Sequence, residues 1–178
     1  MRLFVGLRPP LAIREQLMST MEGVPDARWQ HDEQLHITLR FIGDVEPPQA
    51  EDVALALTGV AIAPLTLRIK GVGAFRTRGQ VRALWARITP REPLTALHKK
   101  IDQALIRIGL APEGRAYLPH ITLARMKGRA TPAEQWLADH GALSSEAFVI
   151  DHMLLFESHL SPAGADYEAI ARYAGSRN

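Results

Sequence analysis

The chain has 178 residues, of which 47% are hydrophobic and 22% are charged, and its formal net charge is +2. A chain of this length buries roughly 70% of its unfolded surface when it folds, so we expect a globular protein with its own core. No apolar run approaches the ~18 residues that cross a membrane, and the apolar start before Arg8 is too short for a secretory signal. We therefore expect a cytoplasmic protein that does not engage membranes.

The basic residues and the absence of cysteine limit which kinds of functional site the chain can contain. The sequence contains no cysteine, which excludes disulfides, thiolate zinc sites and a cysteine nucleophile. The small net charge does not predict a surface that is basic all over. Most of the 21 basic residues are arginine, however, whose planar guanidinium suits phosphate and stacks on bases. A local arginine-lined site therefore stays open.

Hydrophobic periodicity divides the chain into alternating strands and helices. In the first half it predicts strands at 2–7, 35–43 and 64–75, and helices at 11–23 and 47–60. In the second half it predicts strands at 81–88, 119–125, 147–160 and 167–173, and helices at 93–109 and 132–141. Thr131 is the expected N-cap of the last helix, with Glu134 at the capping-box position.

The tetrapeptide His-Ile-Thr-Leu occurs twice, at 36–39 and at 120–123. Each copy lies in the third element of the same order: strand, helix, tetrapeptide strand, helix, strand. An internal duplication explains this order better than chance does. We therefore expect an α+β fold in which residues 1–178 form a single domain. Two pseudo-symmetric lobes would supply mainly antiparallel sheets that line a central cleft, with the helices outside.

The repeated motif places two polar side chains on one face of each strand. Residues i and i+2 of a strand project to the same side, so His36 and Thr38 point together, and His120 and Thr122 repeat this arrangement. If the lobes face each other, these four side chains converge on one cleft. One imidazole can then deprotonate a nucleophile while the other protonates a leaving group, and the hydroxyls can donate to phosphate oxygens. The pattern predicts phosphoryl chemistry without a metal.

Other interpretations compete with this one. A single His-x-Thr in a strand is more often a half-buried structural pair, and only its duplication favours a functional role. A metal site would need a third ligand beside His36 and His120, and Asp44 or His31 would have to supply it without a typical ligand spacing. The chain has no nucleophile-elbow, P-loop or Rossmann glycine pattern. No nucleotide cofactor is therefore expected.

Several segments together resemble the two-histidine phosphoesterase superfamily, and within it the RNA 2′,3′-cyclic phosphodiesterases, also called 2′-5′ RNA ligases. The resemblance covers essentially the whole chain and lies in RLFVGLRPP, LHITLRFIG, PHITLAR and the hairpin GAFRTRGQVRALW. It implies hydrolysis of a terminal 2′,3′-cyclic phosphate of RNA to a 2′-phosphomonoester, with no metal, ATP or other cofactor. The reverse reaction, in which an RNA 5′-hydroxyl replaces water, would form a 2′-5′ linkage.

The resemblance also implies roles for the motif residues. The first histidine of the family is the proton donor, which falls on His36, and the second is the proton acceptor, which falls on His120. Thr38 and Thr122 would hold the phosphate. The implied partners are RNA ends that carry a cyclic phosphate, tRNA halves among them, and we expect a monomer. By residue type alone the two histidines are nearly equivalent, so the sequence does not separate donor from acceptor.

Five positions after each histidine stand Phe41 and Arg125, whose side chains can stack on a base. Family members are similar here, with an aromatic residue and an arginine near the nucleotide. Strict alternation would turn position +5 away from the histidine face. Both residues are therefore predicted to bind substrate only if each strand contains a bulge or ends before them.

The remaining conspicuous residues have less specific expectations. The hairpin arginines are interpreted either as contacts to an RNA backbone or as a solvated turn: Arg76, Arg78 and Arg82. His31 is expected in a connection, His98 on a solvated helix face and His140 at a helix end. No role is expected for His152 or His159. Phe75 and Trp85 are expected in the core rather than as platforms for bases.

Two other functions remain as alternatives to RNA-end hydrolysis. An RNA-binding module with little turnover could use the same cleft, although binding alone does not require two titratable imidazoles. A cyclic phosphodiesterase could also act on a small cyclic nucleotide or on ADP-ribose cyclic phosphate. Comparing a mononucleotide with an oligomer separates these substrates.

Overall fold

A computed structural model describes residues 1–127 and 132–175, and nine strands and four α-helices lie in these ranges. The strands are β1 (Arg2–Leu7), β2 (Ala27–Trp29), β3 (Ile37–Asp44), β4 (Leu65–Thr77), β5 (Gln80–Thr89), β6 (His120–Met126), β7 (Phe148–Ile150), β8 (His152–Ser161) and β9 (Gly164–Ala174). The helices are α1 (Leu11–Met18), α2 (Pro47–Leu57), α3 (Arg91–Arg107) and α4 (Glu134–Asp139), with one 3₁₀ turn, η1 (Asp32–Gln34).

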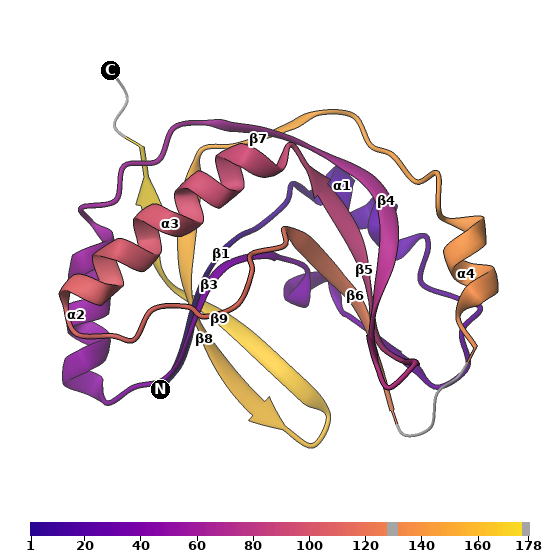
Figure 1. The fold of residues 1–178 in the computed structure, drawn as a ribbon, viewed down its shortest axis with the longest axis horizontal. Coiled ribbons are helices and arrows are strands. Elements are labelled where there is room, and N and C mark those ends of the chain that lie inside the picture. The colour runs from indigo at the N-terminus through magenta and orange to yellow at the C-terminus, as the bar shows by residue number, and fades with distance from the viewer. Residues whose placement is uncertain (128–131, 176–178) are drawn as a thin grey trace.

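All strands join one curled antiparallel sheet, and its order is β7-β4-β5-β6-β3-β1-β8-β9, with β2 beside β6. The two motif strands, β3 and β6, lie at the centre and meet at one pair, Ile37 with Ile121. Beyond this pair the two halves of the sheet splay apart, with hairpin β8–β9 on one side and β4–β5 on the other (Figure 1). The expected α+β fold, with antiparallel strands and outer helices, is confirmed.

The two halves of the sheet are not the two halves of the sequence. β4 follows the first motif but pairs with β5, and β8 follows the second motif but pairs with β1. β4 and β8 therefore each lie in the half of the sheet opposite to the motif strand that precedes them, whereas β7 stays beside β4. Because of this exchange, each wall of the molecule contains residues from both copies of the repeat.

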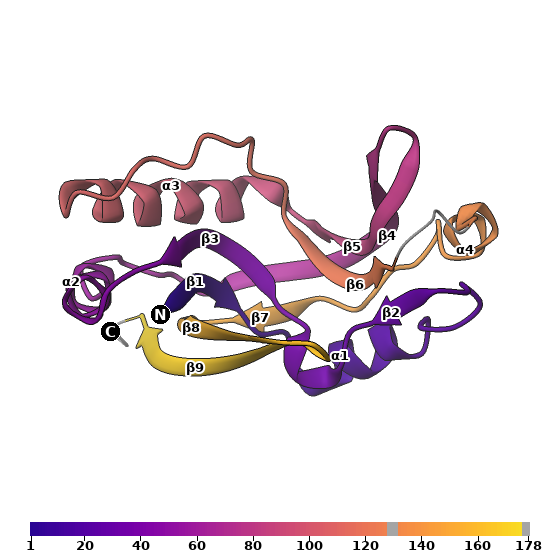
Figure 2. The same cartoon turned by 90° about the horizontal axis from the view of Figure 1, so that it is seen from below.

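Buried alternate residues fix the motif strands to the core. Ile37, Leu39, Ile121 and Leu123 are each at most 1% exposed. α3 packs over β3 with its buried positions at helical spacing, namely Leu94, Leu97, Ile101 and Leu105. Figure 2 shows α3 and α1 on opposite sides of the sheet. Within residues 1–127 and 132–175, none of the helices is long and apolar enough to cross a bilayer.

Several predicted elements need correction. The single strand expected at 147–160 is two strands, because Asp151 interrupts it: β7 pairs with β4 and β8 pairs with β1. Periodicity does not reveal such a break, since the residues on both sides of it are apolar. α4 begins at Glu134 with Ala133 at the N-cap, and Thr131 lies outside the described residues. The short strand β2 was not predicted.

A one-residue bulge in each motif strand changes which side chains share a face. In β3, Thr38 lies opposite Gly6 and Arg40 lies opposite Val5, so one extra residue, Leu39, stands between them. β6 has the same irregularity at Leu123. A bulge shifts the alternation by one residue. Position +5 from each histidine is therefore returned to the histidine face.

Candidate active site

The four motif side chains line one cleft of about 590 Å³ between the splayed halves of the sheet. The cleft contains His36 and Thr38 from the first motif and His120 and Thr122 from the second. The hairpin β8–β9 forms another part of its wall, through residues that include Ser158 and Tyr167. The predicted convergence of the two motifs is thus present in the structure.

Each imidazole is held by the backbone two residues before it. His36 Nδ1 lies 2.7 Å from the carbonyl oxygen of Gln34, and His120 Nδ1 lies 2.7 Å from that of Leu118. A carbonyl oxygen only accepts, so Nδ1 carries the proton in both rings and Nε2 is left as the basic nitrogen. His36 Nε2 lies 3.0 Å from Thr38 Oγ1, from which it accepts a hydrogen bond in this tautomer. Both rings are therefore ready to exchange a proton at Nε2.

Aromatic rings enclose the two histidines. His36 lies 4.7 Å from Phe4 and 5.1 Å from Tyr167, measured between ring centroids. His120 lies 5.0 Å from Phe75 and 5.9 Å from Trp85. Apolar rings exclude water, and removing water from an imidazole disfavours its charged form.

The environment lowers the pKa of both histidines. Burial lowers the pKa of His36 to about 4, against an opposing effect of its hydrogen bond to Gln34. The charges of His120, Arg125 and Arg8 lower it in the same direction as burial. Burial also lowers the pKa of His120, and Arg125 contributes. Both imidazoles are therefore neutral at pH 7 in the free protein, and the larger shift belongs to His36.

Phe41 and Arg125 both line the cleft, and both bulges that this position requires are present. Phe41 lies opposite Phe4 across β1–β3, and the guanidinium carbon of Arg2 lies 5.0 Å from its ring centroid. Its side chain is 42% exposed, so one face of the ring is open. The two residues are thus positioned at the cleft, and binding of a base by them stays a prediction.

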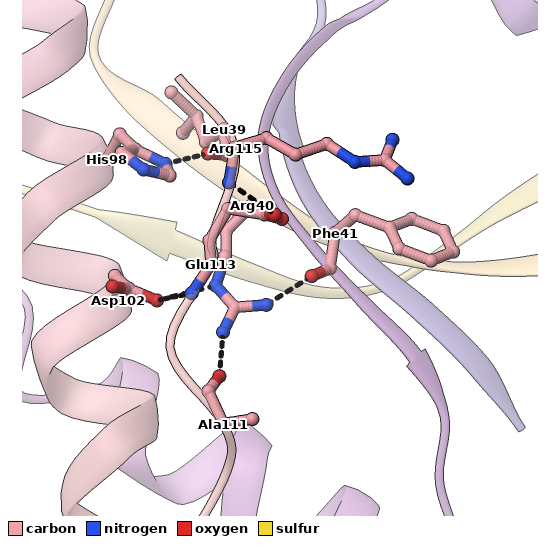
Figure 3. A network of polar contacts seen from close by, with 8 residues as sticks. All are labelled: Leu39, Arg40, Phe41, His98, Asp102, Ala111, Glu113 and Arg115. Carbon is pink, nitrogen blue, oxygen red and sulfur yellow. Dashed lines mark hydrogen bonds and ion pairs between the residues drawn. The ribbon is translucent and has the colours of Figure 1, made fainter. Parts of the chain in front are cut away.

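Side chains hold the backbone of the first motif strand at its bulge, and Figure 3 shows the contacts of His98 with Leu39 and of Arg40 with Phe41. Tyr117 Oη donates to the carbonyl oxygen of Thr38 at 3.0 Å, and His98 Nδ1 lies 2.6 Å from that of Leu39. Arg40 Nη1 donates to the carbonyl oxygen of Phe41. Because a bulge leaves carbonyl groups without strand partners, these contacts satisfy them and hold Thr38 and Phe41 in the cleft.

The expectation that His98 lies on a solvated face is wrong. His98 is 8% exposed, and its ring stacks on Tyr117 at 4.5 Å between centroids and 2° between planes. Its neighbours Lys99 and Lys100 are exposed. Because the prediction for His98 rested on these two charged neighbours, it placed His98 on the exposed face as well. The helix face that includes His98 covers the bulged strand.

We expect Tyr117→Phe to destabilise the protein by about 1–3 kcal/mol, because it leaves a partly buried carbonyl of Thr38 without its donor. Urea denaturation of both proteins measures this difference. Any catalytic activity of the cleft should fall as well, since Thr38 lines it. Tyr173→Phe is the matched control: it removes a similar bond to Ala54 far from the motif, so activity should be retained. Equal activity losses in both variants would contradict this account.

Other predictions have mixed outcomes. Phe75 is not a core residue: it is 38% exposed and meets His120 edge-on, whereas Trp85 is buried as predicted. Arg78 and Gly79 form the expected turn, and Arg76 pairs with Glu134 at 2.8 Å. His31 precedes η1 and His140 ends α4, as expected.

Sequence reasoning missed several cleft residues. Phe4 and Tyr167 flank His36, and Arg28 and Gln30 reach the cleft from β2. Phe4 stood in a predicted strand, but its face could not be assigned without the sheet order. Arg28 lies in a strand too short to show a period, and Gln30 follows directly after that strand. The one available signal for this part of the cleft was an arginine, Arg28, a few positions before the first motif.

The residues that the structure describes do not assemble a metal site in the cleft. One group of three ligating side chains is close enough to hold an ion, and it consists of Glu157, His159 and Glu168 on hairpin β8–β9. None of these lines the cleft. Asp44 and His31, the third ligands considered for a motif-centred metal, do not line it either.

Comparison with known proteins agrees with this geometry. The family model for LigT-like phosphoesterases matches residues 7–85 and 88–167. An RNA 2′,3′-cyclic phosphodiesterase of Aeropyrum pernix is 30% identical over 161 residues, which are 89% of this chain and 90% of that protein. One of the same name from Geobacillus stearothermophilus is 29% identical over 84% of this chain, and the chain spans 48% of its length.

The fold has a close counterpart as well. The crystal structure of a Thermus thermophilus protein superimposes with a TM-score of 0.80 at 22% identity, over 99% of this chain and 100% of that one. The family match covers most of the chain and includes both His-x-Thr motifs. The chain therefore belongs to the LigT-like phosphoesterase family.

Proposed function

We propose that the chain acts as a single domain that hydrolyses the 2′,3′-cyclic phosphate at RNA ends, tRNA halves among them, to a 2′-phosphomonoester. The observation that carries the proposal is the convergence of two His/Thr pairs on one cleft, with Nδ1 of each imidazole on a carbonyl oxygen and Nε2 left as the basic nitrogen. Relatives over most of the chain carry the name RNA 2′,3′-cyclic phosphodiesterase. We place this activity in the cytoplasm, a reducing compartment with which a chain that has no cysteine is compatible.

In the proposed mechanism the phosphate lies between the two motifs, with its non-bridging oxygens on Thr38 and Thr122. Thr38 Oγ1, which donates to His36 in the free protein, turns its proton to the phosphate when substrate enters. His120 Nε2 takes a proton from water as the water attacks phosphorus. His36 delivers a proton to the departing 3′ oxygen, so the P–O3′ bond breaks and the 2′-phosphomonoester remains. With an RNA 5′-hydroxyl in place of water, His120 takes the hydroxyl proton, the P–O3′ bond breaks with the proton from His36, and a 2′-5′ linkage forms.

The donor role of His36 requires a change of protonation on binding. In the free protein its lowered pKa leaves the ring neutral at pH 7. The fixed negative charge of a bound phosphodiester favours the imidazolium form and raises the pKa of both rings. Substrate binding therefore favours protonation of His36, which then holds the proton that the departing 3′ oxygen needs. The surrounding aromatic rings shield this proton from bulk water.

This coupling predicts two different pH profiles. The value of kcat/KM reports the free enzyme, in which one imidazole must be protonated and the other neutral, so we expect a bell. Its acidic limb should lie near the lowered pKa of about 4, and its alkaline limb should lie below 6.5. The kcat profile reports the complex, and both limbs should move to higher pH because bound phosphate raises both pKa values. A kcat/KM that still climbs above pH 7 would contradict the assignment.

The activity is tested with an oligonucleotide that ends in a 2′,3′-cyclic phosphate, incubated with the protein in EDTA. We expect the cyclic phosphate to open to a 2′-phosphomonoester on the oligonucleotide, with no 3′-phosphomonoester formed. A folded protein that gives no product, or product only when a divalent metal is restored, would refute the proposal.

A further inference from the structure

The short strand β2 adds a second group of polar side chains beside the motif residues. β2 pairs with the end of β6 so that Arg28 lies directly opposite Arg125 and Trp29 opposite Ala124. Trp29 contacts Trp136, at 5.8 Å between ring centroids, and the residues on either side of it, Arg28 and Gln30, line the cleft. Arg28 in β2 and Gln30 directly after it thus lie in the lining of the cleft together with Arg125.

Arg28 and Arg125 form an uncompensated pair of positive charges. Like charges directly opposite each other on an antiparallel pair repel. Within residues 1–127 and 132–175, neither guanidinium makes a hydrogen bond or an ion pair with another residue. The charge of Arg125 extends to the motif, since it lowers the pKa of both His36 and His120. An anion between the two guanidiniums would relieve this repulsion.

Gln30 adds a polar side chain to the same part of the cleft. The residue is 7% exposed and lines the cleft beside Arg28 and Arg125, and its amide is not one of the buried polar groups that lack a partner within the described residues. Its backbone N–H donates to the carbonyl oxygen of Leu123 at 2.8 Å, which places Gln30 beside the strand of Thr122. The amide N–H groups of Gln30 can therefore donate to an anion held in this part of the cleft.

We propose that Arg28, Gln30 and Arg125 form a second anion subsite, which binds the phosphate on the 5′ side of the terminal nucleotide. This inference rests on the proposed function, because the first phosphate must occupy the His/Thr motifs. Positions on adjacent strands lie about 4.8 Å apart and alternate positions along a strand about 7 Å apart, so the subsite lies within the reach of one nucleotide. A guanidinium pair matches phosphate through forked, charge-assisted hydrogen bonds. The face of Arg125 remains free to stack on a base.

The subsite defines the substrate class more narrowly. A nucleoside 2′,3′-cyclic phosphate with a free 5′-hydroxyl fills the motifs but leaves the subsite empty. A nucleotide with a 5′-phosphate, or an RNA chain joined there by a phosphodiester, fills both. The enzyme should therefore prefer chain ends to the isolated nucleoside cyclic phosphate.

The test compares adenosine 2′,3′-cyclic phosphate, the same compound with a 5′-phosphate, and a dinucleotide that ends in a cyclic phosphate. We expect wild-type kcat/KM to be about tenfold or more higher for the last two. Arg28→Met and Gln30→Leu should each remove most of that advantage and leave the first substrate within about twofold, since the motifs are untouched. If the 5′-phosphate raises kcat/KM as much as the dinucleotide does, any phosphate at the 5′ position is sufficient. If only the dinucleotide raises kcat/KM, the subsite requires a phosphodiester. Either result supports the subsite.

Arg107→Met is the matched control, because this arginine ends α3 outside the cleft, and it should leave all three substrates unchanged. Equal wild-type efficiency on the three substrates would overturn the subsite alone. Variants that lower all three equally would also overturn it, since they would show a structural role. No hydrolysis of any substrate would overturn the proposed function and this inference with it.

Discussion

His120→Asn should lower kcat by about 10²- to 10⁴-fold, because asparagine keeps a polar side chain of similar size but cannot accept a proton from water. His36→Asn should have a loss in the same range through the leaving group. The double variant should lose less than the product of the two factors, since the rings act on one reaction as a pair. Steady-state kinetics on the cyclic-phosphate oligonucleotide measures all three.

The control for these variants is His152→Asn, whose ring lies outside the cleft and bonds to Asp151. It should keep wild-type activity, and thermal unfolding should show that all four proteins are folded. A His120 variant that retains activity within tenfold would refute its role as base. Full activity of the His36 variant, with His120→Asn inactive, would remove the donor role but leave the cleft as the site.

Arg40→Met should lower the free energy of unfolding by about 3–5 kcal/mol, which is the typical effect of removing one partner of a buried ion pair. Arg40 is 6% exposed, and its Nε donates to Asp102 Oδ1 at 2.8 Å. Its guanidinium also donates to the carbonyl oxygens of Phe41 and Ala111 (Figure 3). The substitution leaves the Asp102 carboxylate without its cationic partner, and it removes the guanidinium donor from both carbonyl oxygens. Chemical denaturation measures the loss.

A double variant distinguishes the ion pair from simple packing. Asp102→Asn added to Arg40→Met removes the stranded charge, so the double variant should be more stable than Arg40→Met alone. Arg107→Met, on the same helix as Asp102 but exposed, should change the free energy of unfolding by less than about 0.5 kcal/mol. If Arg40→Met and Arg107→Met had equal small effects, the network in Figure 3 would not stabilise the fold.

The sequence predicted the motif strands and their faces well because local rules determine them. Alternation around Ile37 and Ile121 put His36 and His120 on one face, and burial of both isoleucines confirms it. Counting along the strand also predicted either a bulge or a strand end before Phe41 and Arg125, and the bulge is what the structure shows. The register shifts at Leu39 and Leu123 confirm that count.

Features that depend on pairing between distant segments were not predictable in the same way. The exchange of β4 and β8 between the halves of the sheet leaves no local pattern, since each strand has the same periodicity whichever neighbour it pairs with. The buried position of His98 depends on α3 covering β3, and its basic neighbours gave the opposite impression. The sequence also could not predict which of the two histidines, His36 or His120, has the lower pKa, because aromatic rings from separate strands surround each of them.

The central claim is that both His/Thr pairs bind one phosphate. It is tested by nuclear magnetic resonance of protein with ¹⁵N-labelled histidine during titration with inorganic phosphate. We predict that the Nε2 resonances of His36 and His120 shift together with one dissociation constant, and that bound phosphate raises the pKa of both rings, that of His36 from about 4. A shift of only one ring, or two different dissociation constants, would contradict a shared phosphate site.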